Sequence, residues 1–127
     1  MNIFVNNIPE FEKDILRAAQ KVVKNEKLKG KLSITFIDDE EMKRLNKKYT
    51  KRDNTTDVLS FHFDNIPELM GDIYISISQA ERQKEKDILS ELKLLTIHGI
   101  LHLAGYDDKT EEQAKAMREK EKSYLNQ

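Results

Sequence analysis

Two histidines near the end of an apolar segment are the residues in this sequence best placed to do chemistry. His98 and His102 are separated by three residues, so on a helix they lie on one face with Cβ atoms about 6 Å apart. Two imidazoles at this spacing can both direct a ring nitrogen at one cation. Gly105 follows, and a glycine at that position is suited to end the helix in a left-handed turn. The chain can then reverse and bring a carboxylate beside the rings.

Either of two neighbouring aspartates, Asp107 or Asp108, can supply that carboxylate. Two histidines and one carboxylate form a three-ligand set for zinc, with a fourth position open to water. The alternative is that both histidines are hydrogen-bonded core residues. Because burying two imidazoles without a partner is costly, the sequence predicts either a metal or polar neighbours around them.

The same spacing occurs in zinc peptidases, which need a glutamate general base directly after the first histidine. Here that residue is Gly99, so the proton acceptor is missing and peptide hydrolysis is disfavoured. A hydrolase whose metal makes hydroxide or polarises a phosphate fits the residues better. Two histidines and a carboxylate also suit non-haem iron, which leaves oxygenase chemistry as an alternative.

A second group of residues, the basic segment Lys43–Arg52, contains six Lys or Arg and no acid. Such a density of positive charge can grip several phosphates of a nucleic-acid strand, and Tyr49 can stack on a base. The simpler interpretation is a solvated helix end, where the helix dipole favours lysine. The net charge of −1 conceals an excess of Lys and Arg in residues 1–52 and an excess of Asp and Glu in residues 53–127.

The elements that position these residues follow from hydrophobic periodicity. The order of elements favours an α+β (mixed α/β) fold, in which about five helices cover a four-stranded mixed sheet, mainly on one face. The short step between the last two strands predicts an antiparallel pair, and the metal site is expected at the C-terminal end of the buried helix near 88–104. We expect strands at 3–5, 32–37, 57–63 and 71–76, and helices at 9–25, from Asp38 or Asp39 to 49, from 78, at 87–104 and at 110–125.

Length and composition predict one domain over residues 1–127, because the 127-residue chain has no repeat and no linker. The absence of cysteine excludes disulfides, thiolate metal sites and cysteine nucleophiles. No apolar run is long enough for a membrane span and the N-terminus lacks a signal-peptide core, so we expect a cytoplasmic protein without a membrane partner.

Three blocks of residues resemble the YbeY family of bacterial metal-dependent endoribonucleases. The first block is Leu45, Asn46 and Tyr49 with residues 56–61, the second is residues 71–76, and the third is residues 98–108. The third block is the most specific to the family.

The resemblance implies a single-strand-specific endoribonuclease that acts in 16S rRNA 3′-end maturation and in late ribosome quality control. RNA and the ribosome or its small subunit are then the expected partners. It also implies one Zn²⁺ per chain, with His98 and His102 matching the first two ligands and Asp108 matching the third, where the family usually has histidine. Because a carboxylate adds negative charge, we expect a less acidic bound water and leave another divalent metal open.

A second departure from the family concerns an arginine that usually follows the tyrosine matched by Tyr49. Here that residue is Thr50, and Lys51 or Arg52 is the candidate replacement. Thr50 and Asp108 favour an alternative function, a ribosome-assembly module that binds RNA with weak or no cleavage. The predicted site residues are His98, His102 and Arg52 for catalysis, His98, His102 and Asp108 for metal, and Lys47, Lys48, Tyr49, Lys51 and Arg52 for RNA. Asp57 and Asp72 are candidate general bases, and His62 is interpreted as a packing or edge residue.

Overall fold

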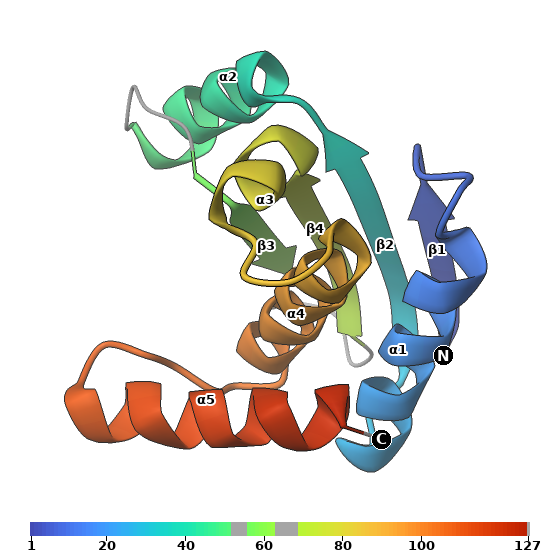
Figure 1. Ribbon diagram of the computed structural model, residues 1–127. Coiled ribbons are helices and arrows are strands. Elements are labelled where there is room, and N and C mark those ends of the chain that lie inside the picture. Colours follow the sequence, from blue (N-terminus) through green and yellow to red (C-terminus); the bar gives the residue numbers. More distant parts are fainter. Residues whose placement is uncertain (52–55, 63–68, 127) are drawn as a thin grey trace.

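One four-stranded mixed sheet forms the centre of the computed structural model, which describes residues 1–51, 56–62 and 69–126 (Figure 1). The order of the strands across the sheet is β1-β2-β4-β3. The β1–β2 and β2–β4 pairs are parallel, whereas β3 and β4 are antiparallel, which confirms the antiparallel pair expected from the sequence. The strands are β1 (Asn2–Asn6), β2 (Gly30–Ile37), β3 (Val58–His62) and β4 (Leu69–Ser76).

Five helices accompany the sheet in the described part of the chain, and together they confirm the α+β class. The helix expected at residues 9–25 begins later, because Pro9 lies in a turn in which the Phe11 N–H donates to the Ile8 carbonyl at 3.1 Å. Ile8 is buried, so the chain has to turn there before the helix starts. The helices are α1 (Glu12–Asn25), α2 (Asp39–Thr50), α3 (Ile77–Gln83), α4 (Ile88–Leu103) and α5 (Glu111–Leu125).

Side-chain caps fix where the helices that carry the site begin. Asp38 caps α2 by accepting a hydrogen bond from the Glu41 N–H at 2.9 Å, which decides between the two aspartates that the sequence offered. Asp87 caps α4 in the same way. Thr110 and Gln113 form a reciprocal capping box at the start of α5. Each of these three helices therefore starts where a short polar side chain accepts a hydrogen bond from one of its free N–H groups.

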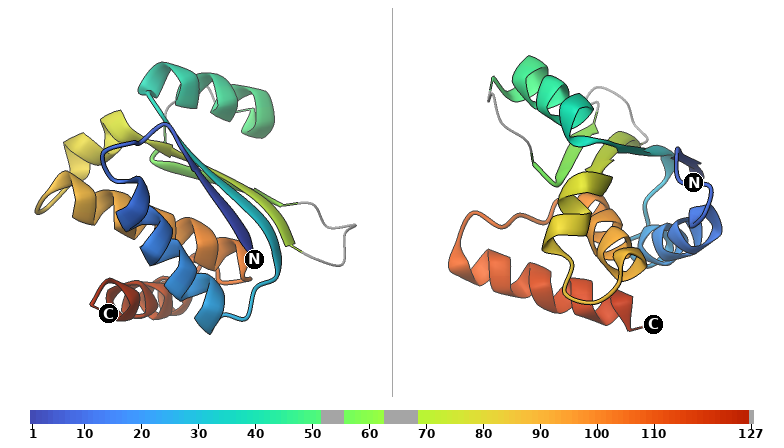
Figure 2. Two further views of the ribbon diagram at one scale, coloured as in Figure 1. Left: turned by 90° about the vertical axis from the view of Figure 1, so that its right-hand side faces the viewer. Right: turned by 45° about the horizontal axis from the view of Figure 1, so that its top comes forward.

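The sheet is covered mainly on one face. Helices α1, α4 and α5 lie on one side of it and α2 lies on the other (Figure 2). Helix α4 packs directly against β3 and β4, and α5 packs on α4. The core between sheet and helices is built from aliphatic side chains, chiefly Ile15, Leu32, Ile34, Ile73, Ile75, Leu92, Ile100 and Leu101.

Helix α4 is apolar nearly all round, as the sequence indicated, and most of its residues are buried. It runs for 16 residues. Across residues 1–51, 56–62 and 69–126, no helix combines the length and the apolarity that crossing a bilayer requires.

Candidate metal centre

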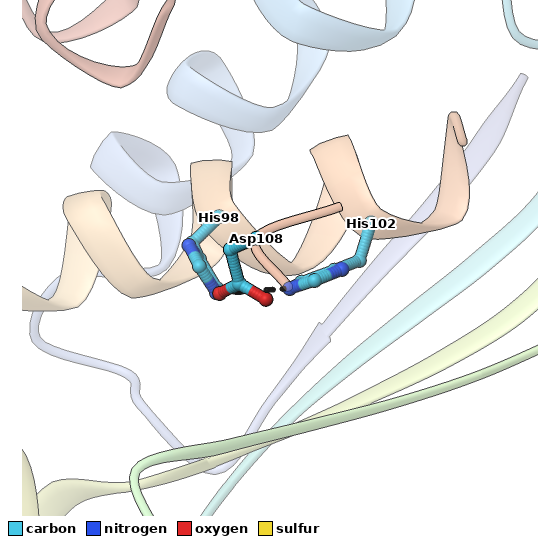
Figure 3. A group of neighbouring side chains, drawn as sticks. All are labelled: His98, His102 and Asp108. Carbon is cyan, nitrogen blue, oxygen red and sulfur yellow. Dashed lines mark hydrogen bonds and ion pairs between the residues drawn. The ribbon is translucent and has the colours of Figure 1, made fainter. Parts of the chain in front are cut away.

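The last turns of α4 and the loop after it bring His98, His102 and Asp108 together (Figure 3). The Nε2 atoms of the two rings lie 3.1 Å apart. The Asp108 carboxylate lies between the rings, with Oδ2 3.8 Å from Nε2 of His98 and 3.7 Å from Nε2 of His102. All three predicted metal ligands therefore direct a donor atom at one point.

The loop has this shape because Gly105 adopts a left-handed conformation, with φ of 106°. Its N–H donates to the His102 carbonyl at 3.1 Å, and the Tyr106 N–H donates to the Leu101 carbonyl at 3.0 Å. This pair of bonds ends α4 and reverses the chain, as expected from the glycine.

The two neighbouring aspartates have different roles. Asp107 accepts a hydrogen bond from the Asp108 N–H at 2.8 Å and pairs with Lys109 at 3.7 Å. Asp107 thus holds the loop in place, and Asp108 is the aspartate that faces the histidine rings.

The donor atoms fit a small divalent cation. A tetrahedral zinc with ligands at about 2.0–2.1 Å places neighbouring donors about 3.3 Å from one another. The observed separations of 3.1, 3.7 and 3.8 Å differ from that value by a few tenths of an ångström. Imidazole nitrogens with one carboxylate oxygen are also the donors that zinc and non-haem iron accept.

An open cleft of about 760 Å³ lies beside this group. Its walls come from the end of α2, from β3 and the residues before it, and from the end of α4 with the loop that follows. A metal held by the three side chains would therefore be accessible to a substrate in the cleft. The lining residues are Asn46, Thr50, Thr56, Asp57, Val58, Leu59, Ser60, His62, His98, His102, Leu103 and Asp108.

A residue without a role in the sequence-based prediction, Glu121 on α5, contacts the site. Its Oε1 lies 2.5 Å from Nδ1 of His98. Burial of the ring lowers the pKa of His98, but the hydrogen bond and charge of Glu121, together with the charges of Asp108 and Asp57, outweigh burial and raise that pKa above its usual value. The available signal was an acid on the buried face of an amphipathic helix, between Met117 and Tyr124.

The predicted RNA-binding residues lie at the exposed end of α2. Lys47, Lys48 and Tyr49 are exposed, and Lys51 follows the helix as a left-handed C-cap. Tyr49 is 55% exposed, and the centre of its ring lies 5.2 Å from the centre of the Phe61 ring and 5.2 Å from the Lys48 ammonium. The prediction for Arg52 falls outside the described residues.

Thr50 occupies the position of the usual family arginine and lines the cleft. Its hydroxyl oxygen lies 2.6 Å from both the carbonyl and the side-chain oxygen of Asn46, which is buried. The side chain at this position is therefore neutral and engaged with its own helix. Any cation that faces the cleft has to come from another residue.

Of the two candidate general bases, Asp57 lines the cleft and Asp72 does not. Asp57 lines the cleft and accepts a hydrogen bond from Gln83 at 3.1 Å. Asp72 alternates along β4 with Gly71 and Ile73, which face α4, so its side chain lies on the opposite face beside Tyr74. The suggestion of Asp72 as a base is therefore wrong. His62 is exposed on the edge strand β3, as expected, and it also lines the cleft.

Gly99, the residue in place of a peptidase glutamate, faces the sheet. A Cβ atom there would lie 2.9 Å from Cγ2 of Ile73 and 3.2 Å from Oγ of Ser60, and that hydroxyl donates to the Gly99 carbonyl at 3.2 Å. Ile73 is fully buried, so it has little room to move. The glycine thus lets α4 approach β3 and β4 closely, and a glutamate there would point at the sheet.

We expect Gly99→Ala to destabilise the fold by about 1–2 kcal/mol. Overpacking a full core costs about 1–3 kcal/mol, and the better helix propensity of alanine returns up to about 1 kcal/mol. Urea unfolding monitored by circular dichroism measures the difference in the free energy of unfolding. Stability equal to or above that of the wild type would show that the helix does not need the glycine.

Fold and site together define an α+β domain with a two-histidine, one-carboxylate centre at the end of a buried helix. The sequence model that describes the endoribonuclease YbeY family matches residues 3–127, and the chain belongs to this family. This confirms the family resemblance found in the sequence.

Curated relatives carry the same family name, and a solved structure shares the fold. The endoribonuclease YbeY of Bacillus licheniformis is 38% identical, over 76% of this chain and 71% of the relative. That of Caldanaerobacter subterraneus is 35% identical, over 98% of this chain and 96% of the relative. The solution structure of TM1509 from Thermotoga maritima is similar with a TM-score of 0.70 and 28% identity, over 98% of this chain and 87% of that one.

Proposed function

We propose that this chain is a metal-dependent endoribonuclease that cleaves single-stranded RNA at one divalent metal held by His98, His102 and Asp108. The observation that supports the proposal best is the convergence of two ring nitrogens and a carboxylate oxygen at the wall of an open cleft. The names of the relatives supply the substrate class. Zinc is the proposed metal, because it accepts this donor set in tetrahedral geometry.

A divalent metal at this position supplies Lewis acidity, which activates a nucleophile and offsets charge that develops on a phosphate. The chain contributes the rest of the arrangement. His98 and His102 turn their Nε2 atoms toward the cleft, and Asp108 holds its carboxylate between them. Asp57 lines the same cleft and is the remaining candidate for accepting a proton.

The end of α2 is the proposed path for RNA into the cleft. Asn46 and Thr50 form part of the cleft wall, and the exposed residues between Lys43 and Lys51 carry positive charge without acids. Tyr49 is more than half exposed, which suits stacking of its ring on a nucleobase that is already unpaired, as in a single strand. The residues proposed to contact RNA are Lys47, Lys48, Tyr49 and Lys51, with Arg52 added from the sequence alone as both an RNA contact and the catalytic cation.

We further propose the biological setting that the family implies. The substrate is the 3′ end of 16S rRNA, the partner is the ribosome or its small subunit, and the protein acts in the cytoplasm as a single domain over residues 1–127. The exposed basic side chains of α2 support this setting, since they provide contacts to RNA phosphates that do not depend on the RNA sequence.

Metal removal tests the proposed function directly. Protein purified without a histidine tag is expected to contain one metal ion per chain by elemental analysis and to cleave a single-stranded RNA faster than its duplex. Dialysis against a chelator is expected to reduce cleavage to the background rate, and one equivalent of Zn²⁺ to restore it, because the Lewis acid is then absent or present. Full cleavage by metal-free protein would contradict the proposal.

The second candidate function is an RNA-binding module of ribosome assembly. It is favoured by Thr50, which leaves a neutral side chain where the family usually has arginine. Measuring RNA binding in parallel with cleavage separates the two functions. Tight, salt-sensitive binding of single-stranded RNA without metal-dependent cleavage would favour the module.

A further inference from the structure

A buried carboxylate outside the ligand set lies behind the metal centre. The Glu121 side chain is 10% exposed and belongs to the face of α5 that packs on α4. Its neighbours on that face, Met117 and Tyr124, are buried members of the hydrophobic core. Since burying an unpaired carboxylate costs several kcal/mol, an acid at this position needs a specific contact.

That contact is the ring of His98. Oε1 of Glu121 lies 2.5 Å from Nδ1, whereas Nε2 of the same ring faces His102 and Asp108. The two nitrogens of an imidazole point in diverging directions, so Glu121 approaches the ring from the side away from the metal position. Glu121 is therefore placed to orient the ligand and is not itself placed to be a ligand.

The hydrogen bond also decides where the ring carries its proton. A carboxylate oxygen accepts hydrogen bonds, so this contact favours the tautomer in which Nδ1 of His98 carries the hydrogen and donates. In the neutral ring this leaves Nε2 without a hydrogen and with its lone pair directed at the metal position. Without Glu121, the ring is free to carry its hydrogen on Nε2, where it would block the metal.

We propose that Glu121 is a positioning residue for the metal centre, which fixes His98 in the tautomer and ring orientation that bind a divalent cation. This inference rests on the proposed function, because it takes His98 to be a metal ligand. A carboxylate behind a ligating histidine raises the basicity of the ring, and loss of such a contact weakens metal binding by about 10–100-fold.

The fold explains how a residue so distant in sequence reaches the ring. The chain reverses at Gly105, and the capping box at Thr110 starts α5 two residues after Asp108. Helix α5 then packs on α4, and its buried face returns to the level of His98. The ligands and their support thus belong to one continuous segment, residues 98–121.

The test compares Glu121→Gln and Glu121→Ala with the wild type. Zinc affinity is measured by competition with a chromophoric chelator, and the His98 tautomer in zinc-free protein is read from ¹⁵N NMR of the ring nitrogens, at one pH where the rings are neutral. We expect Glu121→Ala to weaken zinc binding about 10–100-fold and to populate the tautomer protonated on Nε2. Glu121→Gln is expected to lose about 10-fold, because an amide carries no charge and can either accept from or donate to Nδ1.

The control variant comes from the same helix. Glu119 is exposed on α5 two residues before Glu121, so Glu119→Gln removes one charge from the same part of the helix and is expected to leave zinc affinity and the His98 tautomer unchanged. Wild-type affinity and an Nδ1-protonated ring in Glu121→Ala would overturn the inference alone. A wild-type chain that binds no zinc would overturn the proposed function as well. If Glu121→Ala does not fold, the nearly isosteric Glu121→Gln decides the outcome by the same two measurements.

Discussion

His102→Ala is expected to lose its bound metal and to cleave single-stranded RNA at least about 1,000-fold more slowly than the wild type, while it keeps its fold. The substitution removes one of the two imidazole donors, and a metal centre left with two ligands binds too weakly to supply Lewis acidity. The His102 side chain is 29% exposed, so truncating it leaves only a small cavity. Elemental analysis, circular dichroism and an RNA cleavage assay together measure the three expectations.

His102 is a cleaner target than His98. His98→Ala is expected to abolish metal binding and cleavage too, but it also leaves the buried Glu121 carboxylate without its hydrogen bond, which costs about 1–3 kcal/mol or more of stability. The matched control is His62→Ala, because His62 lines the same cleft from the edge strand β3. We expect the control to retain metal and cleavage. Unchanged cleavage in His102→Ala would remove the basis of the proposed mechanism.

The sequence predicted the fold well where local patterns decide it. Alternating apolar residues indicated β2, the apolar α4 was expected to be buried, and Gly105 was expected to end it in a left-handed turn. The exact start of α1 was wrong, because burial of Ile8 is a tertiary effect that Pro9 does not reveal.

The sequence predicted less of the site, since part of it depends on pairing across the fold. Spacing alone placed His98 and His102 together and left Asp107 and Asp108 equivalent. The family resemblance indicated Asp108, and in the structure Asp108 faces the rings while Asp107 accepts a hydrogen bond within the loop. Asp72 alternates with the buried Ile73 and Ile75 along β4, so its side chain points away from the core, but only the packing of α4 shows that the site lies on the core side. Glu121 is separated from His98 by 23 residues, and only the packing of α5 on α4 brings them into contact.

Asp108→Asn is expected to weaken metal binding by about 10–100-fold or more and to reduce RNA cleavage in parallel. An amide oxygen is a neutral and weaker donor than a carboxylate, so the centre loses both charge and a strong ligand. The matched control is Asp107→Asn. It removes the same charge from the adjacent residue and still offers an oxygen to the Asp108 N–H, so metal affinity is expected to stay close to that of the wild type.

Asp108→His extends this test to the choice of metal, because histidine is the residue that the family usually has at this position. A third imidazole keeps the number of donors and removes one negative charge, so we expect zinc binding to be retained and preference for zinc over oxygen-favouring cations such as Mn²⁺ to increase. Competition between the two metals for wild type and variant measures the change. Equal metal affinity in the wild type, Asp108→Asn and Asp108→His would show that the Asp108 carboxylate lies beside the rings without binding the cation, and the ligand set would then have to be completed by another group.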